Sequence, residues 1–211
     1  MYTPDRFKIK DQDKIFRFIQ AHSFGVLICG DLEATHLPFL LEPSEGECGT
    51  LYSHFARANP HWKSLDGKKV LIIFSGPHSY ISPTWYRNAP AVPTWNYGSV
   101  HVTGKLSVLP ATCTNDVLNR TLAQYDPTLL NERAVVTQAF QDKLSAAIVP
   151  IQISITNLQG QLKLGQHKPA ETQRNVHEAL KASEQLDAQQ LAQFMAEWDL
   201  GTGNTPDSPS D

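Results

Sequence analysis

The chain has 211 residues, a hydrophobic content of 41% and a formal net charge of −3, values typical of one globular domain with a full core. The charge argues against the strongly basic surface of a nucleic-acid-binding protein, and no apolar run is long enough to span a membrane. Three scattered cysteines and a polar N-terminal segment predict a reduced, cytoplasmic protein without a signal peptide.

The first part of the chain predicts one helix followed by short strands. Residues 11–22 place apolar side chains at helical spacing, and strands are expected at residues 24–29, 34–41, 49–55 and 69–74. Pro38 favours an edge position or a bulge for the second of these strands. A short helix is expected to begin at residues 59–62, because Asn59 suits the N-cap and Pro60 the first helical position.

Residues 75–78 (SGPH) are expected to form a turn, and the second part of the chain predicts longer elements. Residues 94–109 indicate one long strand or a bent pair, and residues 148–158 a half-buried antiparallel strand. Helices are expected at residues 112–125, 131–145, 170–182 and 187–198. About six strands with helices at both ends and in one insertion predict a small antiparallel barrel decorated by helices.

An aromatic segment interrupted by prolines spans residues 80–101 and contains the phrase PTW twice, at residues 83–85 and 93–95. Proline fixes the backbone, and Trp and Tyr carry broad apolar faces with one polar group each. Such a segment suits a flat conjugated ligand or a partner surface. Two short strands whose aromatic side chains fill a core are an equally good interpretation.

Two further segments carry candidate anion-binding groups. Residues 54–63 end a strand and open a helix, where Arg57 offers a bidentate fork for phosphate and Lys63 a point charge. An ordinary surface turn before a capped helix is the alternative interpretation. The basic loop at residues 163–168 is either solvated charge or a segment that closes over a phosphate.

Patterns for the common metal, hydrolase and nucleotide sites are missing from the sequence. There is no HExxH and no CxxC, so no metal site is expected. GxSxG, GxGxxG and the P-loop pattern are also absent. A nucleotide-like cofactor would therefore not be held by a Rossmann or Walker frame.

Several short segments form a set with a fixed order along the chain. They are residues 1–7, ATHLP at 34–38, HFARANP at 54–60, FSGPH at 74–78 leading into YISP at 80–83, VPTWNY at 92–97 followed by His101, and KLGQ at 163–166. Together they resemble the PaiB-type FMN-binding negative transcriptional regulators, over about residues 1–182. The sequence departs from the family pattern at Ser53, where Gly is expected, and at Gly165 and His167, where Ser and Asn are expected.

The resemblance implies a mainly β fold with helices, namely an FMN-binding split β-barrel of antiparallel Greek-key type. The split-barrel domain would cover residues 1–182, followed by a C-terminal helix at 183–200 and a disordered tail at 201–211. A homodimer with FMN in the dimer groove is implied as well. The implied cofactor-binding residues are Thr35, His36 and Leu37 along the isoalloxazine, His54, Arg57, Asn59 and Lys63 at the phosphate, Trp85 and Trp95 at the groove, and Lys163 and Gln166 in the basic loop.

Two functions of different class remain open. The first is a flavin-binding regulator without turnover, in which FMN is a ligand or redox sensor and repression acts indirectly or through a partner. The net charge of −3 and the lack of a helix-turn-helix pattern argue against direct DNA binding. The second is a flavin-dependent oxidoreductase acting on a small substrate or NAD(P)H, with His36 and His101 as candidate acid–base groups.

Overall fold

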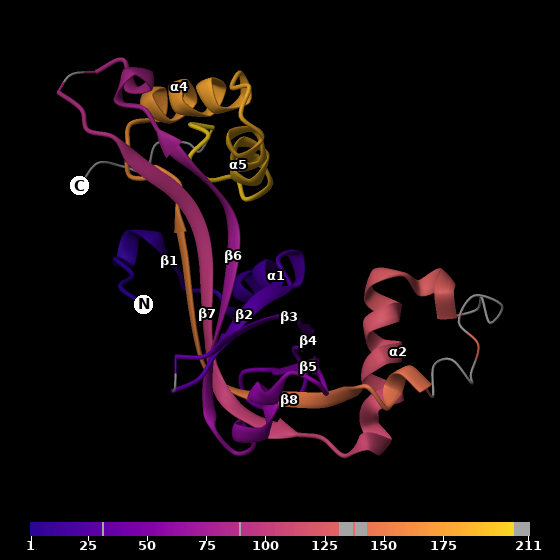
Figure 1. Ribbon diagram of the computed structural model, residues 1–211. Helices are drawn as coiled ribbons and strands as arrows, with labels where there is room; N and C mark the ends of the chain where they lie inside the picture. Colours follow the sequence, from indigo (N-terminus) through magenta and orange to yellow (C-terminus); the bar gives the residue numbers. More distant parts are fainter. Residues whose placement is uncertain (31, 89, 131–136, 138–142, 205–211) are drawn as a thin grey trace. The chain divides into compact units, whose positions relative to one another are not determined.

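The computed structural model describes the chain except for residues 31, 89, 131–136, 138–142 and 205–211 (Figure 1). The described residues contain one sheet of eight strands, in the order β3-β2-β6-β7-β8-β5-β4, with β1 paired to β8. The strands are β1 (Lys8–Ile9), β2 (Phe24–Ile28), β3 (Ala34–Pro38), β4 (Leu40–Glu42), β5 (Thr50–Ala56), β6 (Lys69–Ile81), β7 (Thr94–Val108) and β8 (Ile148–Lys163). The pairings with a described register, β1–β8, β2–β3, β2–β6, β4–β5 and β5–β8, are all antiparallel. Since β3 ends the sheet order, Pro38 lies in an edge strand as predicted.

The helices follow the amphipathic segments of the sequence. They are α1 (Gln12–Ala21), α2 (Thr114–Tyr125), α4 (Ala170–Lys181) and α5 (Leu186–Glu197), with short 3-10 turns η1 (Asp5–Phe7), η2 (Pro60–Ser64), η3 (Pro83–Tyr86), η4 (Ala111–Cys113) and η5 (Pro127–Leu130). These positions confirm the helices predicted at 11–22, 112–125, 170–182 and 187–198. The helix predicted at 131–145 lies largely outside the described residues. Across the described ranges, no helix has the length and apolar character needed to cross a membrane.

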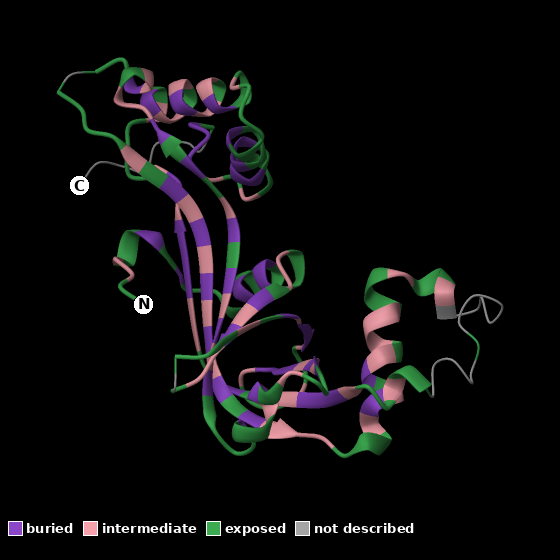
Figure 2. Cartoon of the chain, viewed as in Figure 1, coloured by how far each residue is buried: buried purple, intermediate pink, exposed green. Residues whose placement is uncertain are grey.

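The chain forms two compact units, and the three long strands contribute residues to both. Unit 1 comprises Met1–Lys10, Ser75–Ser99 and Gly160–Asp211, and unit 2 comprises Asp11–Phe74 and Val100–Gln159. Each unit has its own buried side chains, which alternate with more exposed ones along the long strands (Figure 2). The division expected from the sequence, at residues 182 and 200, stays a prediction.

The core of unit 2 follows the period of two that strands impose. In β5, Leu51, Ser53 and Phe55 are buried, while Tyr52 and His54 on the opposite face are half-buried. Close strand packing explains Gly104 in β7, because a Cβ there would lie 2.5 Å from the Ser154 carbonyl oxygen of β8.

The turn predicted at residues 75–78 is wrong, because β6 runs without a break from Lys69 to Ile81. The β2 ladder on β6 ends at Ile73, before Pro77 is reached. A proline has no N–H to donate, so it is tolerated in a strand beyond the reach of that neighbour. Gly76 is buried within the strand instead of forming a turn.

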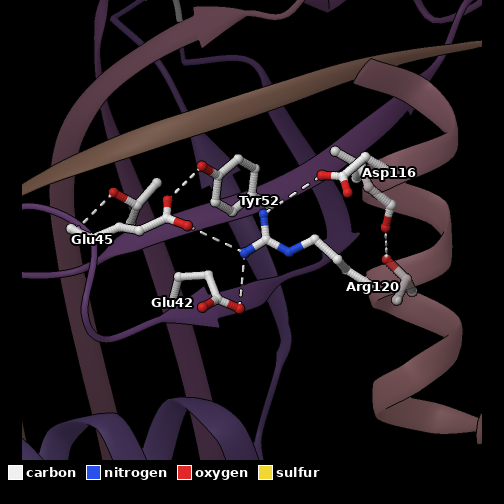
Figure 3. A network of polar contacts seen from close by, with 8 residues as sticks. Glu42, Glu45, Tyr52, Asp116 and Arg120 are labelled. Atoms are coloured by element: carbon white, nitrogen blue, oxygen red, sulfur yellow. Dashed lines mark hydrogen bonds and ion pairs between the residues drawn. The ribbon is translucent and has the colours of Figure 1, made fainter. Parts of the chain in front are cut away.

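Arg120 fixes helix α2 of unit 2 to the β4–β5 hairpin through a network of polar contacts (Figure 3). Its guanidinium lies 2.9 Å from the Glu42 carboxylate, 3.5 Å from Glu45 and 3.8 Å from Asp116. Its Cζ lies 4.3 Å from the centre of the Tyr52 ring, and the Tyr52 hydroxyl donates to Glu45 at 2.5 Å. Burial and this bond to Glu45 raise the pKa of Tyr52 above its ordinary value. The partners satisfy one another, so the network has a structural role.

In unit 1, helix α4 packs against α5 and η3, near the end of β6 (Figure 1). Val176 and Leu180 of α4 and Leu191 and Met195 of α5 are buried. The chain after α5 packs as well: residues 201–203 are buried, and the Gly203 carbonyl accepts a hydrogen bond from Arg174 at 3.0 Å. This corrects the disorder expected from residue 201 onward, because a glycine-rich segment without apolar side chains is held here through its backbone. Residues 205–211 lie outside the described part.

Candidate functional site

A cluster of hydrogen bonds joins the edge strand β3 to the turn η2 in unit 2. The Thr35 hydroxyl lies 2.8 Å from His61 Nδ1 and accepts from the Asn59 amide at 3.4 Å. The Asn59 side chain also caps η2, because its oxygen accepts from the His61 N–H at 3.0 Å. The capping role predicted for Asn59 is thus confirmed. We call these three residues the β3 edge cluster.

His61 is the member of the β3 edge cluster that sequence reasoning did not single out. The residue is 3% exposed, and its ring packs edge-on against Phe55, at 5.8 Å between ring centres. In one tautomer the Thr35 hydroxyl donates to His61 Nδ1 and the imidazole proton lies on Nε2; in the other, His61 Nδ1–H donates to the hydroxyl, which has a second lone pair for it, and Nε2 is an acceptor. His61 Nε2 is buried and has no partner among the described residues. A buried polar nitrogen without a partner is costly in either tautomer unless a ligand satisfies it.

Arg57 follows β5, and main-chain carbonyls hold its side chain in place. Its Nε donates to the Ala146 carbonyl at 2.7 Å and its Nη2 to the Ile148 carbonyl at 2.8 Å. Two of the five guanidinium N–H groups are thereby used, and the planar fork is fixed in an exposed position. Lys63 lies in η2 and is also exposed. The segment predicted to bind phosphate therefore presents one guanidinium held in place by carbonyls and one exposed ammonium group.

The three predicted residues of β3 divide between the two faces of the strand. Thr35 and Leu37 share one face, whereas His36 points to the other, as the period of two requires. The His36 ring stacks on Phe24 at 6.1 Å, and Phe24 is 65% exposed. A flat ligand at this edge therefore meets the side chain of Thr35 or that of His36, and meets the other residue through its backbone.

His54 faces away from the side of β5 that carries Phe55. Burial lowers the pKa of His54, and its Nδ1 has no partner in the described part of the chain. Because His61 packs on Phe55, the structure does not bring His54 into the β3 edge cluster.

The remaining predicted residues lie in unit 1. Trp85 is half-buried in η3, whereas Trp95 at the start of β7 is 53% exposed, close to Tyr80 and His78. The repeated PTW phrase therefore adopts two different structures.

The basic loop after β8 uses its polar groups within unit 1. Lys163 Nζ donates to the Thr94 hydroxyl at 2.6 Å and to the Trp95 carbonyl at 2.9 Å, and burial lowers its pKa. The Gln166 amide accepts from the Leu164 N–H at 2.9 Å and donates to the Leu162 carbonyl at 2.6 Å. The Gln166 side chain thus bonds the main chain of its own loop, and its role in FMN binding stays a prediction. Within the described ranges, no group of three or more His, Cys, Asp or Glu side chains is arranged to hold a metal ion.

Comparison with known proteins gives a consistent picture. Residues 1–157 match the family model described as "Putative FMN-binding domain". The chain is 34% identical over 203 residues to the protease synthase and sporulation protein PAI 2 of Bacillus subtilis, an alignment that covers 92% of this chain and 96% of that protein.

Among solved structures, the chain is similar to the flavocytochrome Anf3 of Azotobacter vinelandii, with a TM-score of 0.60 and 17% identity over 76% of this chain and 71% of that one. It is also similar to the FAD and heme binding protein of Mycobacterium smegmatis, with a TM-score of 0.56 and 14% identity over 75% and 74% of the two chains. These similarities confirm the predicted split-barrel fold class of flavin-binding proteins.

Proposed function

Because the chain belongs to the PaiB-type family of FMN-binding proteins, we propose that it is a regulatory protein in which FMN serves as ligand or redox sensor. The cofactor is FMN, which the matching family names. The name of the Bacillus subtilis relative links that protein to protease synthesis and sporulation, and this supports a regulatory role here. When bound, FMN supplies reversible electron and hydride transfer. The residues of this chain supply binding and orientation.

The observation that carries the proposal is the orphaned His61 Nε2 beside Thr35 and Asn59, with Arg57 oriented nearby in sequence. FMN presents a phosphate dianion, ribityl hydroxyls and ring carbonyls, which are mainly acceptors. Arg57, Lys63, Asn59 and the proposed His61 Nε2–H are donors. The chemistry of this donor set fits FMN, with Arg57 and Asn59 proposed at the phosphate.

A homodimer forms part of the proposal. Strand β3 ends the sheet order, so one of its edges has no neighbouring strand in the described chain. Aromatic side chains are exposed in both units, with Phe24 at 65%, Trp95 at 53% and Tyr80 at 45%. Exposed edges and aromatic patches are commonly covered by a partner. A second copy of the chain would cover them and form the groove for FMN, to which Trp85 and Trp95 are proposed to contribute.

Repression would act through a partner protein instead of direct DNA contact. The chain has 18 Lys and Arg against 21 Asp and Glu, and phosphate neutralisation by basic residues supplies most of the affinity for DNA. A reducing, cytoplasmic location is part of the same proposal, and the three free cysteines support it.

The test is a titration of the purified protein with FMN and with riboflavin, followed by addition of NADH or NADPH under air. A regulator binds FMN more tightly than riboflavin and oxidises neither nicotinamide faster than free FMN does. Sustained oxidation by the FMN-loaded protein would contradict the regulatory proposal and favour an oxidoreductase. Sedimentation of the same sample checks the dimer, and a monomer at micromolar concentration would contradict the shared groove.

A further inference from the structure

Unit 1 contains a pocket of about 180 Å³. Its lining includes Lys163, which the family resemblance implied at the cofactor, but none of the groups that we propose hold FMN, namely Arg57, Asn59 and His61. It lies among η1, η3, the start of β7, the end of β8 with its loop, and the first turns of α4. Four basic side chains line it, from parts of the chain that are distant in sequence: Arg6, Lys163, His167 and Lys168. All elements that form the pocket belong to unit 1.

The charge of this pocket has one sign. None of its lining residues is Asp or Glu, and none of the four basic side chains forms an ion pair with a carboxylate within the described ranges. Burial, Lys168, Arg6 and Lys163 together lower the pKa of His167. Like charges that converge on one cavity without a counter-charge favour an anion in it.

The walls behind the charges are apolar and aromatic. Phe7 and Tyr86 are 5% and 7% exposed. Arg6 Cζ lies 5.1 Å from the centre of the Phe7 ring, and the His167 ring meets the same ring edge-on at 5.3 Å. Lys168 Nζ lies 5.4 Å from the centre of the Tyr86 ring. One cation thus lies over each of two rings, Arg6 over Phe7 and Lys168 over Tyr86, and this combination of apolar wall and positive charge suits a ligand with one apolar body and one negative end.

We propose that this pocket binds a small carboxylate built on a single ring, as a ligand separate from FMN. An apolar cavity of about 150 Å³ accepts a benzene ring, which leaves room for about one further small group. Sites for drug-sized ligands have volumes of about 300–1,000 Å³, so this pocket is too small for a whole FMN molecule. The buried Asn96 amide lines the same pocket and offers a hydrogen bond to the carboxylate.

Calorimetric titration with benzoate tests this proposal, with benzamide as the neutral isostere. We expect benzoate to bind and benzamide to bind at least about tenfold more weakly, a difference of about 1.4 kcal/mol. Benzoate affinity should rise as the pH falls through the range in which His167 gains its proton. The titrations are run on the protein with and without FMN, and FMN should leave benzoate affinity unchanged.

Substitutions locate the site. Arg6→Gln and Lys168→Gln each remove one exposed charge at the pocket and should weaken benzoate about tenfold. Lys8→Gln and Lys181→Gln make the same charge change in unit 1 outside the pocket lining, and should leave the affinity unchanged. Melting temperatures of all four variants establish that they fold.

Several results would overturn the proposal. Absence of benzoate binding, or equal binding of benzoate and benzamide, would show that the pocket is not a site for anions. An equal loss of benzoate affinity in the control variants would show that binding depends on the overall charge of the protein and not on this pocket. Competition between benzoate and FMN would make the pocket part of the flavin site, a result that leaves the proposed flavin function intact.

Discussion

Replacing Arg57 by Ala separates the structural role that its hydrogen bonds show from the role in FMN binding that we propose for it. The guanidinium holds the Ala146 and Ile148 carbonyls, and it is also the proposed partner of the FMN phosphate. Loss of two exposed hydrogen bonds should cost roughly 1–2 kcal/mol of stability. For a chain of this size that corresponds to a fall in melting temperature of about 2–8 °C.

The effect on cofactor binding is expected to be larger and selective. A charge-assisted bond to phosphate is worth about 1.5–3 kcal/mol, so FMN affinity should fall roughly ten- to hundredfold. Riboflavin lacks the phosphate and should bind the variant and the original protein equally. Arg57→Lys keeps the charge but loses the planar fork of the guanidinium. Its FMN affinity should therefore lie between that of the original protein and that of Arg57→Ala.

Fluorescence titrations with FMN and riboflavin measure the selectivity, and thermal melts measure the stability. Lys105→Ala, an exposed change in the same unit, is the matched control and should alter neither ligand's affinity. Equal weakening of FMN and riboflavin by Arg57→Ala would refute the phosphate role. It would leave Arg57 as a structural residue that holds the start of β8.

Three further predictions concern unit 2. Arg120→Ala removes the ion pair to Glu42 and the contact with the Tyr52 ring. It should lower the free energy of unfolding by about 2 kcal/mol and the melting temperature by about 4–8 °C, measured by calorimetry. A shift in melting temperature within error would contradict the structural role of this network. Gly104→Ala should lower the free energy of unfolding, measured by urea denaturation, by about 1–3 kcal/mol, because its Cβ would lie 2.5 Å from a backbone oxygen. Gly30 has open space around it, so Gly30→Ala is the control and should be neutral or slightly stabilising. Burial lowers the pKa of His54, so its contribution to stability is complete above its unfolded pKa of about 6.5 and is lost as the pH falls through the lower folded value. His54→Gln should flatten the loss of stability on acidification, and an unchanged slope would show that other groups cause it.

The sequence predicted elements where local pattern and capping chemistry decide the structure. The alternation of Leu51, Ser53 and Phe55 defined β5, and Asn59 with Pro60 defined the start of η2. Residues 75–78 were predicted wrongly because Gly and Pro signal a turn locally. Only the sheet register shows that the β2 ladder ends before Pro77 and lets the strand continue.

The parts of the site that sequence reasoning missed depend on contacts between distant residues. His61 gains its significance from Thr35, 26 positions earlier, and no local pattern indicates that pairing. Gln166 carries an amide that could donate and accept hydrogen bonds with a ligand, yet this amide bonds the main chain of its own loop. The basic pocket is formed by residues near position 6 and residues near position 168. The sequence alone therefore does not show that these positive charges lie close together.

A crystal structure of the protein with FMN would show which side chains hold the phosphate and the flavin ring. We expect the phosphate against Arg57 and Asn59, a hydrogen bond between His61 Nε2 and the same FMN molecule, and the ring beside β3 in a groove completed by a second copy of the chain. Density for the phosphate in the pocket of Arg6, Lys163 and Lys168, with Arg57 bound only to the Ala146 and Ile148 carbonyls, would contradict this expectation.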